Sequence, residues 1–113
     1  MANLSAPPKE VAARIVKEVG FEERIMGCRF RERSGPMAVT LYSFREVVVF
    51  LNDRFPLIDF ERLEDWTRET MGDHELAERI GGIIKQDQSD QAKTIQIREL
   101  MAERLLQCES IVV

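Results

Sequence analysis

Three polar residues that commonly begin helices, Ser43, Asp59 and Asp73, each precede within three residues a set of apolar residues at helical spacing. A side-chain oxygen at such a position accepts a hydrogen bond from one of the first free amides of the helix. Ser43 and Glu46 form a capping box, the reciprocal version of this motif. The apolar stripes are Phe44, Val47, Val48 and Leu51; Phe60, Leu63 and Trp66; and Leu76, Ala77, Ile80, Ile83 and Ile84. The pattern predicts three short helices in succession, the second ending at Gly72.

Two places in these helices leave alternatives open. The apolar run 47–50 would suit a buried strand by composition, although the cap and the spacing favour a helix. Gly81 and Gly82 each cost a helix about 1 kcal/mol relative to alanine. They therefore indicate close helix packing or a helix end. Trp66 lies on an apolar stripe and is expected in the core.

The chain before these helices predicts one more. Apolar residues recur at helical spacing over 11–19, after Pro7 and Pro8. Gly20 stands where a left-handed residue often ends a helix. Residues 1–6 carry little pattern and are expected to be mobile.

Between 28 and 42 the pattern changes to alternation around Ser34-Gly35-Pro36, which is typical of a β-hairpin. One face is expected to carry Cys28, Phe30, Met37, Val39 and Leu41. The other is expected to carry Arg29, Arg31 and Arg33. Two strands alone are marginal in water, so the apolar face is predicted to pack on helices.

The fold class is therefore mainly α, with four or five helices and a short β-hairpin near residues 28–42 packed against them. The 113 residues, 44% hydrophobic and 32% charged, predict a single domain over 1–113. No apolar run approaches the roughly 20 residues that cross a bilayer, and no signal-peptide stretch is present. We expect a cytoplasmic protein without membrane contact. Cys28 and Cys108 are expected to be free thiols.

Residues 90–109 form a long helical pattern without glycine or proline. One apolar face carries Ile97, Leu100, Met101, Leu105 and Cys108, and a second carries Ala92, Ile95, Ala102 and Leu106. The second face indicates either a helix wedged between two others of the chain or a surface for a second copy or a partner protein. The leading functional hypothesis is a non-enzymatic interaction or regulatory module that self-associates through this helix.

Four arginines, Arg24, Arg29, Arg31 and Arg33, suggest a second hypothesis. The last three share one face of the predicted strand, and guanidinium groups bind phosphate and carboxylate well. The net charge of -4 disfavours a general attraction to nucleic acid but leaves a local anion-binding or nucleic-acid-binding surface open. The alternative is a solvated outer face of the hairpin.

Motifs for catalysis are sparse. The sequence has no phosphate-binding glycine loop, no Cys-x-x-Cys pair and no G-x-S-x-G elbow, so no cofactor is predicted. Asp73, His74 and Glu78 could take a divalent metal, which makes a small metal-dependent enzyme the third hypothesis. Capping and the helix dipole account for acidic residues at a helix start without a metal. We therefore favour a chain without a metal or catalytic site.

The stretch 30–83 resembles an uncharacterised prokaryotic domain family. Its elements read here Phe30, Gly35, Leu41-Tyr42-Ser43-Phe44, Asp59-Phe60, Trp66 and Gly72-Asp73-His74-Glu75-Leu76-Ala77-Glu78-Arg79-Ile80. The resemblance implies a hairpin followed by helices, and it implies no activity because the function of that family is unknown. Arg54-Phe55-Pro56 lacks the histidine found there in many members of the family, so no histidine chemistry carries over.

Overall fold

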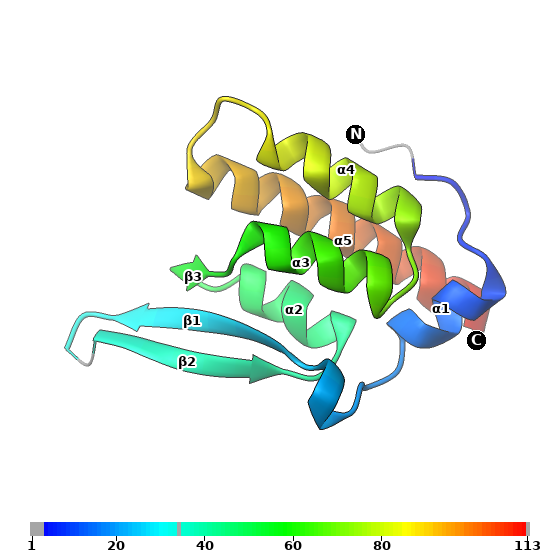
Figure 1. Cartoon of the computed structure of the whole chain (residues 1–113), viewed down its shortest axis with the longest axis horizontal. Helices are drawn as coiled ribbons and strands as arrows, with labels where there is room; N and C mark the ends of the chain where they lie inside the picture. Colours follow the sequence, from blue (N-terminus) through cyan, green and yellow to red (C-terminus); the bar gives the residue numbers. More distant parts are fainter. Residues whose placement is uncertain (1–3, 34, 113) are drawn as a thin grey trace.

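The computed structural model describes residues 4–33 and 35–112. Within these residues it has five α-helices and a three-stranded antiparallel sheet, which confirms the mainly α fold with a hairpin (Figure 1). In chain order the elements are α1 (Lys9–Ile15), the 3₁₀ helix η1 (Phe21–Glu23), β1 (Ile25–Arg31), β2 (Gly35–Leu41), α2 (Phe44–Leu51), β3 (Pro56–Leu57), α3 (Phe60–Glu69), α4 (His74–Ile84) and α5 (Asp90–Val112).

The long helix α5 is the element on which most of the others pack. Helices α1, α2 and α4 each contact α5, and α3 packs on α4. Figure 1 shows α5 passing behind α3 and α4, with α2 on the side nearer the sheet. The predicted core face of α5 is confirmed, since its buried residues include Ile97, Leu100, Met101, Leu105 and Cys108. One face of one helix therefore organises the core.

The predicted caps begin helices α2, α3 and α4. Ser43 Oγ accepts a hydrogen bond from the amide of Glu46 at 3.0 Å. The Glu46 carboxylate in turn accepts one from the amide of Tyr42 at 2.6 Å. The carboxylates of Asp59 and Asp73 accept amide hydrogen bonds at the starts of α3 and α4. The helix-start signals in the sequence were therefore correct.

The alternatives left open within these helices are settled by packing. The run 47–50 is helical. Trp66 is fully buried, and its indole Nε1 donates to the carbonyl of Glu23 at 2.7 Å. Gly81 is buried, and a Cβ atom there would lie 3.0 Å from the carboxylate of Glu64 on α3. Gly81 thus marks a close approach of α3 and α4, whereas Gly82 is exposed with open space around it.

Helix α1 is shorter than the predicted helix over 11–19. It ends at Ile15, and the amide of Val19 donates to the carbonyl of Tyr42 at 2.7 Å. Residues after Ile15 leave the helix because this backbone bond holds them beside the end of the hairpin. The expected left-handed cap at Gly20 is also wrong, because its φ of -76° is available to any residue.

Residues 1–6 are expected to be mobile, but Leu4 and Ser5 are docked on the helices. Leu4 is 8% exposed and belongs to the hydrophobic core. Arg104 Nη1 donates to the carbonyl of Ser5 at 2.6 Å, and Gln107 Nε2 donates to the carbonyl of Leu4 at 3.1 Å. Residues 1–3 lie outside the described part.

The sheet has the strand order β2-β1-β3, and its third strand was not predicted. Ile25 pairs with Leu41, and Gly27 pairs with Val39. Residues directly opposite each other share a face of the sheet. This face packs on α2, because Ile25 and Leu41 are buried and a Cβ atom at Gly27 would lie 2.6 Å from Phe50. Gly27 therefore lets the sheet approach the helix closely.

The predicted division of the hairpin into an apolar and an arginine face is wrong. Arg29 pairs with Met37, and Cys28 pairs with Ala38. Arg29 therefore shares a face with Met37, whereas Cys28 and Phe30 lie on the opposite face with Ala38. The alternation of side chains along each strand was predicted correctly. Which side chains of β1 share a face with which side chains of β2 depends on the pairing register, and this was not predicted.

We predict opposite effects of alanine at two glycines. Gly27→Ala places a methyl group against the buried ring of Phe50 and should destabilise the fold by about 1–3 kcal/mol. Gly82→Ala, in an exposed helix position with open space around it, should stabilise the fold by about 0.5–1 kcal/mol. Urea unfolding measures both, and a Gly27→Ala variant as stable as the native protein would contradict the close packing.

Candidate functional site

The predicted second face of α5 lies on the surface. Ile95 is 40% exposed and Leu106 is 68% exposed. Ala92 and Ala102 are half-buried. The interpretation of α5 as a helix wedged between two others therefore fails for Ile95 and Leu106. We call these four residues the exposed face of α5.

Helix α2 adds a large apolar side chain next to this face. Arg45 on α2 forms an ion pair with Glu109 on α5, which joins the start of α2 to the end of α5. Val49 lies one helical turn after Arg45, and Leu106 lies one turn before Glu109, so both flank this pair. Val49 is 66% exposed. Val49 was not predicted as part of an interaction surface. The signal for it was its position opposite the apolar stripe of α2, where a valine is exposed to water.

The other end of the exposed face borders a hollow. Ile95 lines this hollow, which has a volume of about 330 Å³, together with Leu51, Phe55 and Leu57. Phe55 and Leu57 are themselves more than half exposed. The apolar surface therefore extends from α5 to the loop that follows α2.

Two arginines of the second hypothesis have partners within the chain. Arg24 donates to the carbonyl of Phe21 at 2.7 Å, and its guanidinium lies 3.7 Å from the centre of the Phe21 ring. Arg29 pairs with Asp53 at 2.6 Å. The carboxylate of Asp53 offsets the positive charge of Arg29. An anion is therefore attracted less strongly to this part of the surface.

The remaining two arginines lie toward the tip of the hairpin. Arg33 is exposed and lines an open hollow of about 760 Å³, to which Arg54 and Glu32 also contribute. The side chain of Arg31 lies outside the part of the chain that the structure describes. Arg29 lines the same hollow, so the structure brings Arg29 and Arg33 together there. Arg24 lies at the opposite end of β1 and is not part of it.

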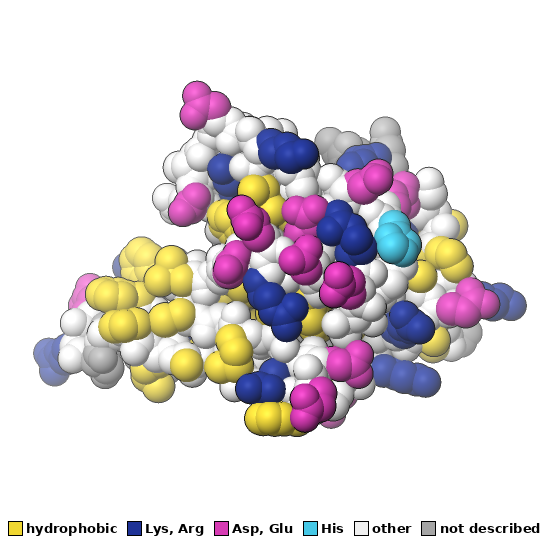
Figure 2. All heavy atoms as spheres, viewed as in Figure 1, with side chains coloured by type: hydrophobic (Ala, Val, Ile, Leu, Met, Phe, Trp, Pro, Cys, Tyr) yellow, Lys and Arg dark blue, Asp and Glu magenta, His cyan; other side chains and the backbone are white. Residues whose placement is uncertain are grey.

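The residues considered for a metal have other roles. The Asp73 carboxylate caps α4 and pairs with Arg104 at 2.8 Å. His74 and Glu78 are exposed on α4, and Figure 2 shows His74 on the surface among charged side chains. Over residues 4–33 and 35–112, no three His, Cys, Asp or Glu side chains come close enough to hold a metal ion.

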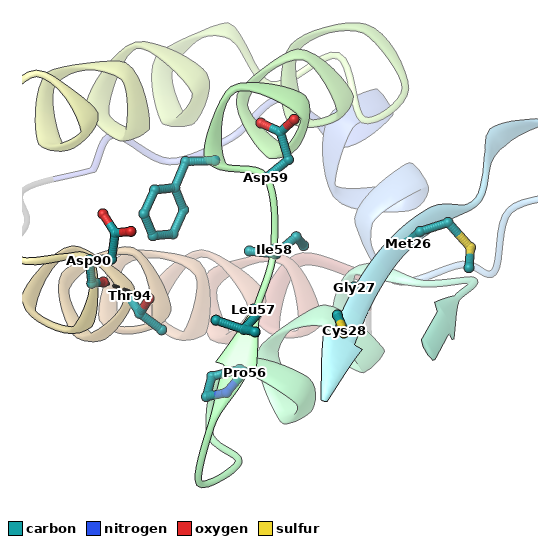
Figure 3. Close-up of a pocket in the computed structure, with 10 residues that line it drawn as sticks. Met26, Gly27, Cys28, Pro56, Leu57, Ile58, Asp59, Asp90 and Thr94 are labelled. Carbon is teal, nitrogen blue, oxygen red and sulfur yellow. Dashed lines mark hydrogen bonds between the residues drawn. The ribbon is translucent and has the colours of Figure 1, made fainter. Parts of the chain in front are cut away.

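The face of the sheet turned away from α2 is also apolar. Met26, Phe30 and Leu57 are between 44% and 53% exposed. Figure 2 shows the corresponding hydrophobic surface over the hairpin. It adjoins a hollow of about 560 Å³ between β1, the segment 56–60 and the start of α5. Figure 3 shows Cys28 on β1 facing Pro56 and Leu57 at this hollow.

A buried arginine joins α5 to the start of α4. Arg104 is 1% exposed and pairs with Asp73 through Nε at 2.8 Å and with Glu75 through Nη2 at 2.7 Å. A buried charge is tolerated when it is paired and hydrogen-bonded in this way. The sequence contained a signal for it, because Arg104 falls in the middle of the apolar face of α5, between Met101 and Cys108.

This cluster affects two titrations. The hydrogen bond from the amide of Ser5, followed by that from Arg104, lowers the pKa of Glu75 below its ordinary value of 4.5. Burial raises the pKa of the Cys108 thiol to about 11, against the opposing charge of Arg104. Both described cysteines are free, so Cys108 is a protonated core thiol at neutral pH.

We predict that Glu75→Gln destabilises the protein in a pH-dependent way. A lowered pKa in the folded state means that ionised Glu75 stabilises the fold above pH 4.5, and that this contribution disappears as the pH falls through the lowered value. The urea midpoints of native and variant proteins should therefore differ at pH 7 and converge toward pH 3. Glu61→Gln, at an exposed position on α3 and away from α5, measures the effect of removing one charge elsewhere. If the urea midpoints of the native and Glu75→Gln proteins differed equally at pH 7 and at pH 3, the lowered pKa of Glu75 in the folded protein would be contradicted.

Comparisons with protein-family models, curated proteins and solved structures found no match. The resemblance to a prokaryotic domain family therefore remains a prediction. Among the described helices, none has the length and apolar character needed to cross a bilayer.

Proposed function

We propose that this chain is a non-enzymatic interaction or regulatory module that self-associates, or binds a partner protein, through the exposed face of α5. One observation carries the proposal: Ile95 and Leu106 stay in water while the opposite face of the same helix is packed into the core. Single exposed apolar side chains are common on proteins. Ile95 and Leu106 lie three turns apart on one side of α5, and Val49 on α2 lies beside this side. Such a grouping of exposed apolar side chains supports an interaction surface.

The dimensions of this face suit a second helix. From Ala92 to Leu106 it extends about 21 Å along α5, at 1.5 Å per residue. The small side chains of Ala92 and Ala102 permit a close approach, and Ile95 and Leu106 supply apolar area. Burying one such large side chain completely contributes about 1.5–3 kcal/mol. The same face on a second copy offers the same arrangement, so a two-fold contact between copies is the simplest assembly.

Other proposals have less support from the chain. An anion-binding surface remains a proposal, but the pairing of Arg29 with Asp53 weighs against it. A metal-dependent enzyme would have to use Asp73, whose carboxylate already serves α4 and Arg104. We also place the module in the cytoplasm, which the two unpaired thiols support.

The test is a pair of charge substitutions on the exposed face. Leu106→Glu and Ile95→Glu each place a carboxylate in the proposed interface, where burying an unpaired charge is costly. We expect both variants to sediment as 13.1 kDa monomers, whereas the native chain sediments as a larger species. Their far-UV circular dichroism should match the native spectrum, because both positions are exposed in the isolated chain.

Phe30→Glu is the matched control, because Phe30 is 48% exposed on the outer face of the sheet, away from α5. We expect this variant to keep the native assembly. The proposal would be refuted if Phe30→Glu dissociated the assembly and Leu106→Glu left it intact. The interface would then lie on the sheet. Unfolding of Leu106→Glu would show instead that this residue belongs to the core.

A further inference from the structure

A hollow at one end of the exposed face of α5 lies between two segments of the chain. One wall is the loop that follows α2, and the other is formed by the first turns of α5. Figure 3 shows Pro56 and Leu57 of this loop beside the start of α5. The apolar lining comprises Leu51, Phe55, Pro56, Leu57 and Ile95. We call it the Arg98 hollow, because Arg98 also lines it.

The Arg98 hollow has the size of a site for a small molecule. Its volume is about 330 Å³, and pockets that bind small ligands begin at about 300 Å³ and are mostly apolar. At about 30 Å³ for each water molecule in the liquid, this volume corresponds to about eleven water molecules. A ligand of about ten non-hydrogen atoms therefore fills the hollow.

Arg98 is half-buried beside the apolar lining. Within the described part of the chain, its guanidinium makes no hydrogen bond and no ion pair. The other described arginines that are half-buried or buried each bond to a carboxylate or a carbonyl group: Arg24, Arg29, Arg68 and Arg104. A guanidinium that is partly removed from water requires acceptors for its donors. The planar fork of donors on Arg98 is thus free for a ligand.

The other charged groups around the hollow are Asp53, Arg54 and Asp90. Asp53 pairs with Arg29 at 2.6 Å, so its charge is already offset. Asp90 is exposed at the first residue of α5, where the free amides of a helix stabilise a carboxylate. Arg54 and Arg98 therefore outnumber the one remaining carboxylate. The hollow attracts an anion although the whole chain has a net charge of -4.

Arg98 and Asp90 lie at opposite ends of the part of α5 that lines the hollow. They are eight residues apart, which is about 12 Å along the helix at 1.5 Å per residue. Thr94 and Ile95 lie between them. An anionic group bound at Arg98 is thus kept away from the carboxylate of Asp90, and the space between them is available for an apolar body.

We propose that the Arg98 hollow binds a small aliphatic carboxylic acid, with its carboxylate on Arg98 and its aliphatic chain on Leu51, Phe55 and Leu57. A carboxylate accepts two parallel hydrogen bonds from a guanidinium fork. A purely apolar molecule would leave Arg98 without an acceptor, and a small hydrophilic anion would leave the apolar lining in water. The inference does not rest on self-association, because one chain supplies the whole lining.

The experiment titrates the full chain at pH 7 with octanoate, which has ten non-hydrogen atoms and an ionised carboxylate. Amide chemical shifts in NMR spectra should change in segments 53–57 and 90–98. Octanol, which has the same aliphatic chain without the charge, should bind at least about tenfold more weakly. Acetate, which has the charge without the chain, should not bind at the same concentrations.

Arg98→Gln should weaken octanoate binding about tenfold or more and leave octanol binding unchanged, because only octanoate uses the charge. Phe55→Ala should weaken both ligands, because it removes apolar lining. Arg62→Gln is the matched control, since Arg62 is an exposed arginine on α3 that does not line the hollow. It should leave the affinity for octanoate unchanged.

The titration is repeated on Leu106→Glu, because self-association through α5 could cover Ile95. Binding of octanoate to this variant with Arg98 dependence supports the proposal whether or not the native chain self-associates. Absence of octanoate binding to both the native chain and Leu106→Glu would overturn it. Equal octanoate affinity of the native chain and Arg98→Gln would also overturn it, since the fatty acid would then bind to apolar surface alone.

Discussion

The burial of Arg104 is the constraint on which the arrangement of the helices depends. A guanidinium group that is 1% exposed must have its charge and its donors satisfied within the protein. Asp73 and Glu75 provide the carboxylates, so the start of α4 is fixed against α5. Asp73 also caps α4, which means that one side chain both begins a helix and positions it. The backbone of Ser5 completes the cluster and fixes the chain that leads into α1.

Helix α5 has one buried face and one exposed face. Its buried face carries the core and the arginine cluster, on which α1, α2 and α4 pack. Those helices cover one side of α5 and leave Ile95 and Leu106 exposed. The proposed interface is thus a consequence of the packing, because the domain contributes too few elements to enclose a helix with two apolar faces.

The helices could be predicted because their signals are local. Ser43 and Asp59 sit next to the amides that they cap, and apolar spacing shows which side of each helix is buried. Which side chains of the two hairpin strands share a face could not be predicted. This depends on the register that pairs Cys28 with Ala38 and not on either strand alone. Arg104 was visible as a charge on an apolar face, but its partners come from distant segments. The exposed face of α5 was predicted as a pattern, and only packing could show that it stays uncovered.

Self-association through the exposed face of α5 can be measured directly. Light scattering of the native chain over a dilution series, at low and at high salt, measures this without any substitution. An apolar interface predicts a mass above 13.1 kDa that falls on dilution and does not fall when salt is added. An assembly that dissociates on adding salt would indicate an electrostatic contact instead. A monomer at every concentration would contradict self-association through α5.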